Sequence, residues 1–359
     1  MQACVIHKDN LGEPREVFTV EDVPRPDIGL GDVLVKMNTT AIHHNTSWIA
    51  LGKPINVVKT ERHIGGSGGV GVVTDIGSDV TSIEIGQAVF LTCNMIVNGS
   101  LRILGYETPG GTFAEYCCVK DYMCIPLTDS INKNAATVFN NIVASWQMLF
   151  GWEPHIVKPG SVVLIWGASG SIGSIAVHLV QKAGGIPIAV TSSPVKQKYC
   201  MEIGATHALN RRDYPHLNGT TSDNRSMNRF IRDVRRAGGK LPDIVFEHSG
   251  ASTLATSVAV CDKNGMIVLC GATSGYEAVI DVRRIWVQQK RFQGSHYYDT
   301  KHTEKIIASC QDSAYDNLVT DNQYTLHDIG ELTSQMRECH QDRVLNNIII
   351  NVDPGTRQQ

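Results

Sequence analysis

A glycine-rich run at residues 166–174, WGASGSIGS, limits how this chain can fold more than any other feature. An apolar run typical of a buried strand precedes it, and an Ala/Val/Leu-rich segment typical of a helix follows it. A strand, a G-x-x-G-x-x-G turn and a helix in this order are typical of dinucleotide-binding sheets. We expect Gly167 to form the tight turn, Gly170 to let the backbone approach a pyrophosphate, and Gly173 to let helix and strand pack closely. The predicted cofactor-binding turn comprises Gly167, Ser169, Gly170, Ser171, Ile172 and Gly173.

The chain around this turn alternates between strand and helix patterns. Six short apolar runs are separated by helix-compatible segments, at residues 162–166, 186–191, 207–209, 244–247, 266–270 and 291–294. Six such units predict an α/β fold with a doubly wound parallel sheet, a Rossmann domain.

The end of the second predicted strand indicates which nicotinamide cofactor binds. NAD sites usually carry an Asp or Glu there, which holds the ribose hydroxyls. This chain has Thr-Ser-Ser-Pro-Val-Lys at 191–196, with Ser192, Ser193 and Lys196 and no carboxylate. Hydroxyl and ammonium groups suit a 2′-phosphate, so we expect NADPH; an ordinary solvated helix start is the alternative.

The rest of the chain predicts a second, β-rich domain. Up to about residue 125, Gly, Pro and Asp turns separate short strand patterns at 17–23, 32–37, 69–76, 88–92 and 112–119. A helical pattern covers 134–152, and after about residue 297 we expect one amphipathic helix and a closing strand near 346–352 that returns to the first domain. The predicted domains are therefore 1–125 with 297–359, and an inserted cofactor domain at 126–296.

Composition excludes several classes of protein. The chain has 32 Lys and Arg against 35 Asp and Glu, a net charge of −3, so we expect neither nucleic acid nor an anionic membrane as partner. No apolar run reaches the length of a bilayer span, and the first eight residues lack a signal-peptide pattern. Ten cysteines in 359 residues are too sparse for a disulfide framework. We expect free thiols and a cytoplasmic location.

The sequence offers no plausible metal site. Structural zinc needs four suitably spaced cysteines, and Cys117 and Cys118 are adjacent on a strand, where they point to opposite faces. His43 and His44 diverge in the same way. The stretch Arg62-His-Ile-Gly-Gly-Ser-Gly68 lacks the His-Glu pair of zinc-dependent alcohol dehydrogenases.

Several motifs together resemble the zinc-free medium-chain dehydrogenase/reductase superfamily and, within it, its crotonyl-CoA carboxylase/reductase branch. They are LIWGASG at 164–170, TSSP at 191–194, DIVFEHSG at 243–250, TSGYE at 273–277 and KRFQGSH at 290–296. The resemblance covers essentially the whole chain. It implies that the β-rich domain is GroES-like, and it assigns His248 and Ser249 to the cofactor site.

The resemblance also implies a reaction and a set of catalytic residues. Members of this branch add hydride to the β-carbon of an α,β-unsaturated thioester, and the enolate then attacks CO2. The family's CO2 pocket corresponds here to Asn45, Glu107 and His296. Tyr106 replaces a family Phe, and His43 and His44 precede Asn45. These three side chains could instead give the enolate a proton.

Alternatives to carboxylation stay open on the sequence alone. The enolate could be protonated or cyclised, or the protein could be a zinc-free enone or quinone reductase. Each functional residue also has a structural alternative, such as a loop salt bridge for Glu107. The stretch between Cys93 and Gly105 is shorter than in the family, so the acyl carrier could be CoA or an acyl carrier protein. The superfamily usually associates through an edge strand, so we expect a homodimer or higher homo-oligomer.

Overall fold

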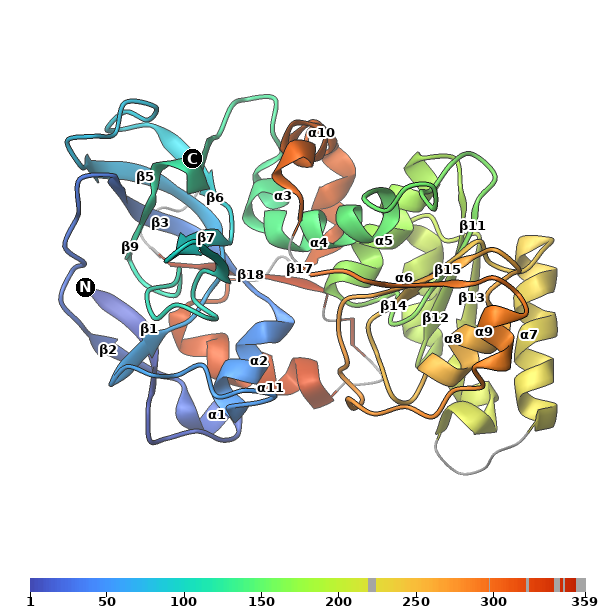
Figure 1. Ribbon diagram of the computed structural model, residues 1–359. Helices are drawn as coiled ribbons and strands as arrows, with labels where there is room; N and C mark the ends of the chain where they lie inside the picture. Colours follow the sequence, from blue (N-terminus) through green and yellow to red (C-terminus); the bar gives the residue numbers. More distant parts are fainter. Residues whose placement is uncertain (219–223, 297, 321–322, 339–342, 345, 353–359) are drawn as a thin grey trace. The chain divides into compact units, whose positions relative to one another are not determined.

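The chain divides into two compact units in a computed structural model (Figure 1). The structure describes residues 1–359 except 219–223, 297, 321–322, 339–342, 345 and 353–359. Unit 1 comprises Met1–Asn140, Ile307–His340 and Asn347–Gln359, and unit 2 comprises Asn141–Ile306 and Gln341–Asn346. The division therefore falls at residue 140 rather than 125. Asn132 and Asn134 explain the difference, because both donate to the Asp316 carboxylate within unit 1.

Unit 2 contains the predicted parallel sheet. Its strands are β11 (Val162–Ile165), β12 (Ile186–Thr191), β13 (His207–Asn210), β14 (Ile244–Glu247), β15 (Met266–Leu269) and β16 (Arg291–Gly294). Their order is β13-β12-β11-β14-β15-β16, and every pairing is parallel. All six predicted strands are confirmed, with ends that differ by at most one residue. Buried aliphatic runs on both faces are what a parallel sheet between helices requires.

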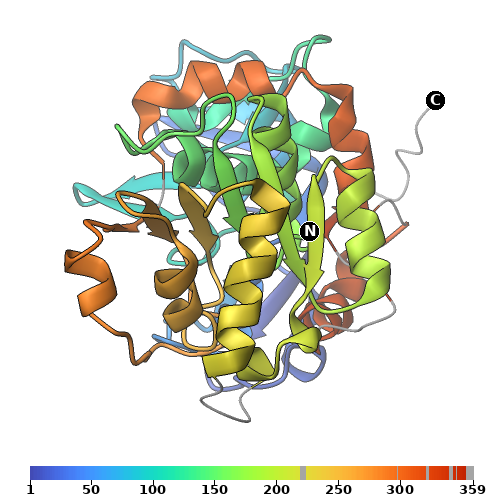
Figure 2. The same ribbon diagram turned by 90° about the vertical axis from the view of Figure 1, so that its right-hand side faces the viewer.

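Helices cover this sheet (Figures 1 and 2). Side chains of α7 (Asn224–Gly238) and α8 (Leu254–Val260) pack with Val162 and Leu164 in one apolar cluster. Successive strand side chains alternate between faces, so Val163 and Ile165 point the other way. The helix α5 (Ser171–Lys182) packs on β11 and β12, and α6 (Pro194–Glu202) on β12 and β13. Strand–helix alternation thus brings every β–α turn to the carboxyl edge of the sheet.

Unit 1 is the β-rich domain. One sheet has the order β10-β6-β5-β3-β18-β17, with β9 also paired to β3, and a second has the order β2-β1-β4. The first contains β10 (Cys124–Pro126), β6 (Ala88–Leu91), β5 (Gly69–Ile76), β3 (Asp32–Ile42), β18 (Asn347–Asn351), β17 (Val319–Thr320) and β9 (Tyr116–Lys120). The second contains β2 (Thr19–Asp22), β1 (Gln2–His7) and β4 (Arg62–Ile64). A separate antiparallel hairpin consists of β7 (Asn94–Val97) and β8 (Ser100–Ile103). The predicted closing strand is confirmed: β18 pairs antiparallel with β3.

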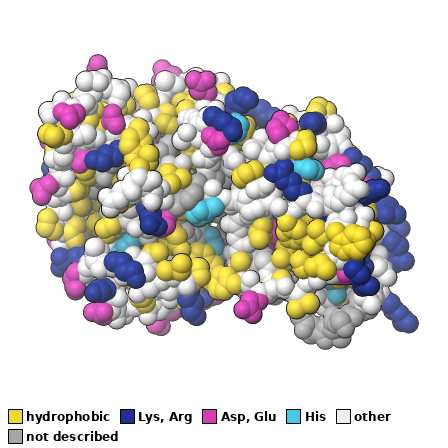
Figure 3. All heavy atoms as spheres, viewed as in Figure 1, with side chains coloured by type: hydrophobic (Ala, Val, Ile, Leu, Met, Phe, Trp, Pro, Cys, Tyr) yellow, Lys and Arg dark blue, Asp and Glu magenta, His cyan; other side chains and the backbone are white. Residues whose placement is uncertain are grey.

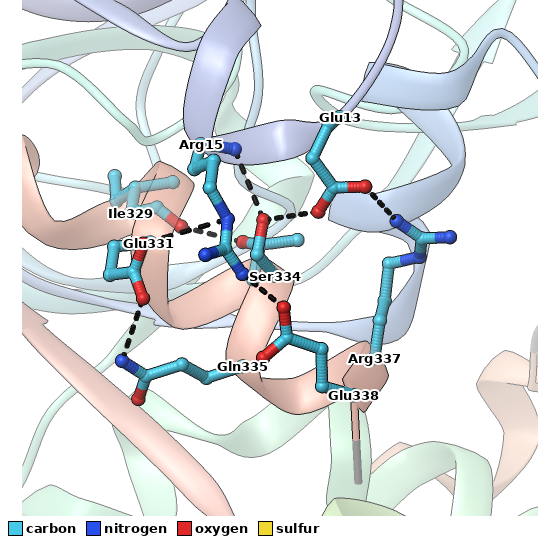
Figure 4. Close-up of polar contacts among 9 residues, drawn as sticks. Glu13, Arg15, Ile329, Glu331, Ser334, Gln335, Arg337 and Glu338 are labelled. Carbon is cyan, nitrogen blue, oxygen red and sulfur yellow. Dashed lines mark hydrogen bonds and ion pairs between the residues drawn. The ribbon is translucent and has the colours of Figure 1, made fainter.

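Two expectations about helices differ from the structure. The helical pattern at 134–152 forms two helices, α3 (Lys133–Thr137) and α4 (Phe139–Phe150). The single amphipathic helix expected after residue 297 is in fact two helices, α10 (Thr303–Ser309) and α11 (Ile329–Glu338). Polar contacts join α11 to the short helix α1 (Pro14–Val17), as Figure 4 shows. The pattern missed α10 because it is only two turns long.

Candidate active site

The glycine turn has the geometry of a phosphate-binding loop. Gly167 adopts φ +54°, and a Cβ there would lie 2.8 Å from Cε1 of His248. A Cβ on Gly173 would lie 2.3 Å from the Gly167 carbonyl oxygen, so only glycine fits. Gly170 is the N-cap of α5, in an extended conformation, and glycine has no side chain that could cap the helix end. The N–H groups and dipole of α5 are thus presented to an anion, as a dinucleotide pyrophosphate requires.

The serines of this turn have different roles. Ser171 donates its hydroxyl to the Asn346 carbonyl at 2.7 Å, so this side chain fastens a later segment of unit 2 to the turn. The Ile172 carbonyl accepts a hydrogen bond from Ser145. Ser169 is buried beside them. The backbone amides, rather than these hydroxyls, are the groups that suit a phosphate here.

His248 closes the turn from the neighbouring strand β14. Its Nε2 donates to the Trp166 carbonyl at 2.8 Å, since a carbonyl can only accept. Burial lowers the pKa of His248, so the ring is neutral at pH 7. The imidazole lies where a side chain on Gly167 would be, and it fixes that residue's backbone.

Glu247 is a residue that the sequence analysis missed. It is fully buried and accepts hydrogen bonds from the Ser249 amide at 2.7 Å and from the Ser257 hydroxyl at 2.6 Å. Ser257 in turn accepts from Nε1 of Trp166 at 2.8 Å. These contacts fasten the β14–α8 turn, which carries Ser249, to the phosphate turn. The signal in the sequence was a lone carboxylate that ends an apolar strand and is followed by His-Ser-Gly.

The residues predicted to distinguish NADPH from NAD, Ser192, Ser193 and Lys196, follow the end of β12. The Ser193 hydroxyl caps α6 by accepting from the Lys196 amide, so it has a structural role. Lys196 is buried, and its Nζ lies 3.5 Å from the Ser192 hydroxyl. An ammonium group beside a hydroxyl at a strand end can hold an added phosphate.

Arg211 is a second residue that sequence reasoning missed. Thr191 and Asn210 are register partners in β12 and β13, so Ser192 and Arg211 follow them side by side at the same sheet edge. A cavity of about 660 Å³ opens there, lined by Arg211, Arg212, Leu217, Asn218, Ser252 and Ser274. Strand order and register, which the sequence does not state, bring the guanidinium group to the cofactor edge.

Asn45 and the two histidines lie at the start of α2 (His44–Leu51) in unit 1. His43 is the N-cap and is buried, and the His44 ring packs edge-on against Trp48 with centroids 5.2 Å apart. Asn45 donates from Nδ2 to the Ser67 hydroxyl at 2.9 Å. Three predicted site residues therefore share one helical turn.

Tyr106 and Glu107 lie in the turn after β8, also in unit 1. Glu107 forms an ion pair with Arg102 at 3.0 Å and accepts from the Ile103 amide at 2.9 Å. The carboxylate therefore fastens its own turn, which is the loop salt bridge that the sequence left open. The half-buried Tyr106 packs against an apolar cluster that includes Ile49 of α2.

His296 belongs to unit 2, where it is exposed just beyond β16. The preceding residue, Ser295, donates its amide to the Leu269 carbonyl at 2.8 Å, which continues the pairing with β15. The structure thus places five of the six predicted catalytic residues in unit 1 and the sixth at the carboxyl edge of the sheet in unit 2.

The described part of the chain contains neither a metal-ligand cluster nor a membrane-spanning helix. No three His, Cys, Asp or Glu side chains among them lie together as a metal ion needs. The prediction of a zinc-free protein stays a prediction. Within the same described part, no helix has the length and apolarity to cross a bilayer.

Comparison with known proteins identifies the class. Family models described as "Alcohol dehydrogenase GroES-like domain" and "Zinc-binding dehydrogenase" match residues 29–129 and 171–312. A GroES-like domain with a six-stranded parallel sheet and a glycine phosphate turn defines the medium-chain dehydrogenase/reductase superfamily. The predicted fold class is confirmed.

Individual relatives narrow the assignment. Crotonyl-CoA carboxylase/reductase of Cereibacter sphaeroides is 33% identical over 84% of this chain and 76% of its own. Crotonyl-CoA reductase of Streptomyces avermitilis is 30% identical over 96% of this chain and 87% of its own. The chain belongs to the crotonyl-CoA carboxylase/reductase family.

Solved structures agree with this assignment. Crotonyl-CoA carboxylase/reductase AntE in complex with NADP has a TM-score of 0.88 and 33% identity, covering 99% of this chain and 95% of that one. The 2-octenoyl-CoA carboxylase reductase CinF, in complex with NADP and 2-octenoyl-CoA, has a TM-score of 0.89 and 25% identity, covering 100% and 88%. The resemblance predicted from the sequence motifs is confirmed.

Proposed function

We propose that this protein is an NADPH-dependent enoyl-thioester reductase that traps its enolate with CO2. The cofactor supplies a hydride to the β-carbon of the α,β-unsaturated thioester, and the electron pair of the C=C bond becomes the enolate. The enolate's α-carbon then attacks CO2, and the new C–C bond yields a carboxylate. The observation that carries the proposal is the match of the entire chain to a carboxylase reductase that holds NADP and 2-octenoyl-CoA.

Three residues are assigned to CO2 in this proposal. CO2 has no net charge, so N–H donors have to hold its oxygens while carboxylate charge develops. Asn45 offers a carboxamide N–H and His296 an imidazole N–H. Glu107 acts through its turn, which it fastens by binding Arg102 and the Ile103 amide.

The cofactor site in this proposal combines the phosphate turn with the β12 edge. Gly167, Gly170 and Gly173 leave room for the pyrophosphate at the start of α5. Ser192, Lys196 and Arg211 supply one hydroxyl and two cations at adjacent strand ends, which suits a 2′-phosphate.

Simple reduction is the second candidate function. The observation that favours it is the position of His43 and His44, which directly precede Asn45 at the start of α2. Imidazole titrates near neutral pH and is the commonest proton donor in catalysis. A proton delivered to the α-carbon from here would give a saturated thioester.

The proposal also covers the acyl carrier of the substrate and the cellular location of the protein. An acyl-CoA is the preferred carrier, because CinF binds 2-octenoyl-CoA. We place the protein in the cytoplasm, since the described cysteines are thiols rather than disulfides, as a reducing compartment favours.

A homodimer is the proposed assembly. The strand β16 is at one edge of the unit 2 sheet, and an unpaired edge can add a strand from a second copy. Hydrophobic side chains gather over the neighbouring α9 (Arg283–Trp286) in Figure 3, and Trp286 is 71% exposed. Apolar exposure beside an unpaired edge supports association there.

The test is product analysis. The protein is incubated with NADPH and crotonyl-CoA, with and without bicarbonate plus carbonic anhydrase, and the products are identified by mass. We expect a product heavier by one CO2 only when CO2 is present. His296→Ala should lower the carboxylated product on the order of 100-fold while NADPH oxidation continues, because one oxyanion donor is lost. His207→Ala, at an exposed histidine of β13, is the matched control.

Two results would contradict the proposal. Saturated thioester in both tubes would rule out carboxylation and leave proton transfer as the function. Equal loss of both activities in His296→Ala would indicate that this residue positions the thioester rather than CO2.

A further inference from the structure

The loop at residues 65–68, between β4 and β5, is held from both sides. A Cβ on Gly66 would lie 2.6 Å from the Thr112 hydroxyl oxygen, and one on Gly68 would lie 2.1 Å from Nδ2 of Asn140. Asn140 donates to the Ser67 carbonyl at 2.7 Å and accepts from the Cys93 amide at 3.1 Å. The backbone on both sides of Ser67 is therefore close-packed and hydrogen-bonded.

Two threonines complete this fastening. The hydroxyls of Thr40 and Thr112 donate to the Gly68 carbonyl at 2.8 and 3.0 Å. Both side chains are fully buried, and so is nearly all of Ser67, which is 2% exposed. The main chain that carries the Ser67 hydroxyl is therefore held in place, and close packing around this buried side chain restricts its rotation.

Asn45 depends on this hydroxyl for its orientation. The second torsion of an asparagine side chain is broad, so the backbone of α2 alone does not set the direction of the amide. Nδ2 carries two protons, and one of them is donated to Oγ of Ser67 at 2.9 Å. That bond selects one orientation of the carboxamide plane and directs the second N–H away from Ser67.

We propose that Ser67 is a positioning residue that aims the Asn45 amide at CO2. This inference rests on the proposed function and adds a residue to it: Ser67 touches neither thioester nor cofactor in this scheme and acts through Asn45. Neutral CO2 binds weakly, so a donor already oriented before CO2 arrives favours carbon capture over protonation of the enolate.

The test is a double-mutant cycle on the product ratio. Ser67→Ala, Asn45→Ala and the double variant are assayed with NADPH, crotonyl-CoA and varied CO2, and carboxylated and saturated products are quantified. We expect Ser67→Ala to lower the carboxylated-to-saturated ratio about two- to tenfold, the range of one hydrogen bond, and to raise the KM for CO2. In the Asn45→Ala background the same change should alter the ratio no further.

Ser334→Ala is the matched control. It makes the same change at another fully buried serine, which accepts from the Arg15 amide at 3.1 Å, and it leaves the Asn45–Ser67 bond and the 65–68 loop in place. We expect it to lower the melting temperature and keep the wild-type ratio, whereas a shift like that of Ser67→Ala would show that loss of stability alone sets the outcome. Additive effects of Ser67→Ala and Asn45→Ala would overturn the inference. A wild type that forms only saturated thioester would overturn the proposed function, and the role of Ser67 with it.

Discussion

Two imidazoles, those of the buried His63 and the partly buried His248, have their tautomers set by backbone carbonyls. His63 is 1% exposed and lies 3.0 Å through Nε2 from the Gly105 carbonyl, so Nε2 carries the proton. Its Nδ1 has no hydrogen-bond partner among the described residues. His63 thus holds the turn that carries Tyr106 and Glu107, as His248 holds the phosphate turn.

The charge state of His63 predicts a pH dependence of stability. Burial lowers the pKa of His63 below its usual 6.5. Below pH 6.5 the unfolded chain therefore binds a proton that the folded chain does not, and the free energy of unfolding falls as the pH falls. Above pH 6.5 both states are neutral and the contribution is constant. For one proton the slope is at most about 1.4 kcal/mol per pH unit.

His63→Gln measures this contribution. Glutamine keeps an N–H for the Gly105 carbonyl and cannot titrate. Urea unfolding between about pH 5 and about pH 6.5 should therefore show a flatter dependence of the unfolding free energy on pH than in the wild type. The slope that remains is expected from His248 and His302, whose pKa values burial also lowers. An unchanged slope would mean that the folded protein protonates His63 as readily as the unfolded chain.

At the scale of elements, α11 is fastened to α1 by one buried hydroxyl and a surrounding set of charges (Figure 4). Ser334 is fully buried, accepts from the Arg15 amide at 3.1 Å and donates to the Glu13 carboxylate at 2.6 Å. That bond lowers the pKa of Glu13. Arg337 binds the other Glu13 oxygen at 2.7 Å, closer to solvent.

Burial predicts which of these contacts matters more. Ser334→Ala leaves the Arg15 amide without its acceptor and should lower the free energy of unfolding by about 1–3 kcal/mol. Arg337→Ala removes a partly exposed ion pair and should cost less than about 1 kcal/mol. Chemical denaturation of both variants makes the comparison. A larger loss in Arg337→Ala would show that charge, rather than the buried hydroxyl, holds α11.

At the scale of the whole molecule, the edge strand β16 predicts how two copies associate. The amide of Arg291 binds the Gly265 carbonyl of the β15 side, and that of Ser295 binds Leu269. Alternate amides point to opposite sides of a strand, so the Phe292 N–H points to the outer edge. A second copy could pair there through main-chain hydrogen bonds.

Phe292→Pro tests this pairing without disturbing β15. Proline removes the outward N–H, whereas Phe292→Ala keeps it. Analytical ultracentrifugation should find a dimer for the wild type and for Phe292→Ala, and a monomer for Phe292→Pro. A dimeric Phe292→Pro would place the interface elsewhere, and a monomeric wild type would remove the homodimer from the proposed function.

The sequence predicted what depends on local pattern. Unit 2 was predicted nearly strand by strand, because buried parallel strands are short apolar runs and the glycine turn fixes where the first strand ends. In unit 1, β1 was missed although Ala3–Ile6 is buried, because four successive apolar residues do not show the apolar–polar alternation of a half-buried strand.

What the tertiary structure decided is which residues meet. Asn45 and Ser67 are 22 positions apart in the chain. The sequence singled out Asn45 as a candidate site residue and gave Ser67 no role, and only the fold places the two side chains in hydrogen-bond contact. Arg211 reached the cofactor edge through the register of β12 and β13, and Glu247 became the centre of a buried network. The sequence by itself determined the fold class, the cofactor turn and the family motifs, since each lies within one contiguous stretch. Contacts between distant stretches depend on strand order and register. These are selected by how well all the apolar faces are buried together in the core, which no single stretch of sequence records.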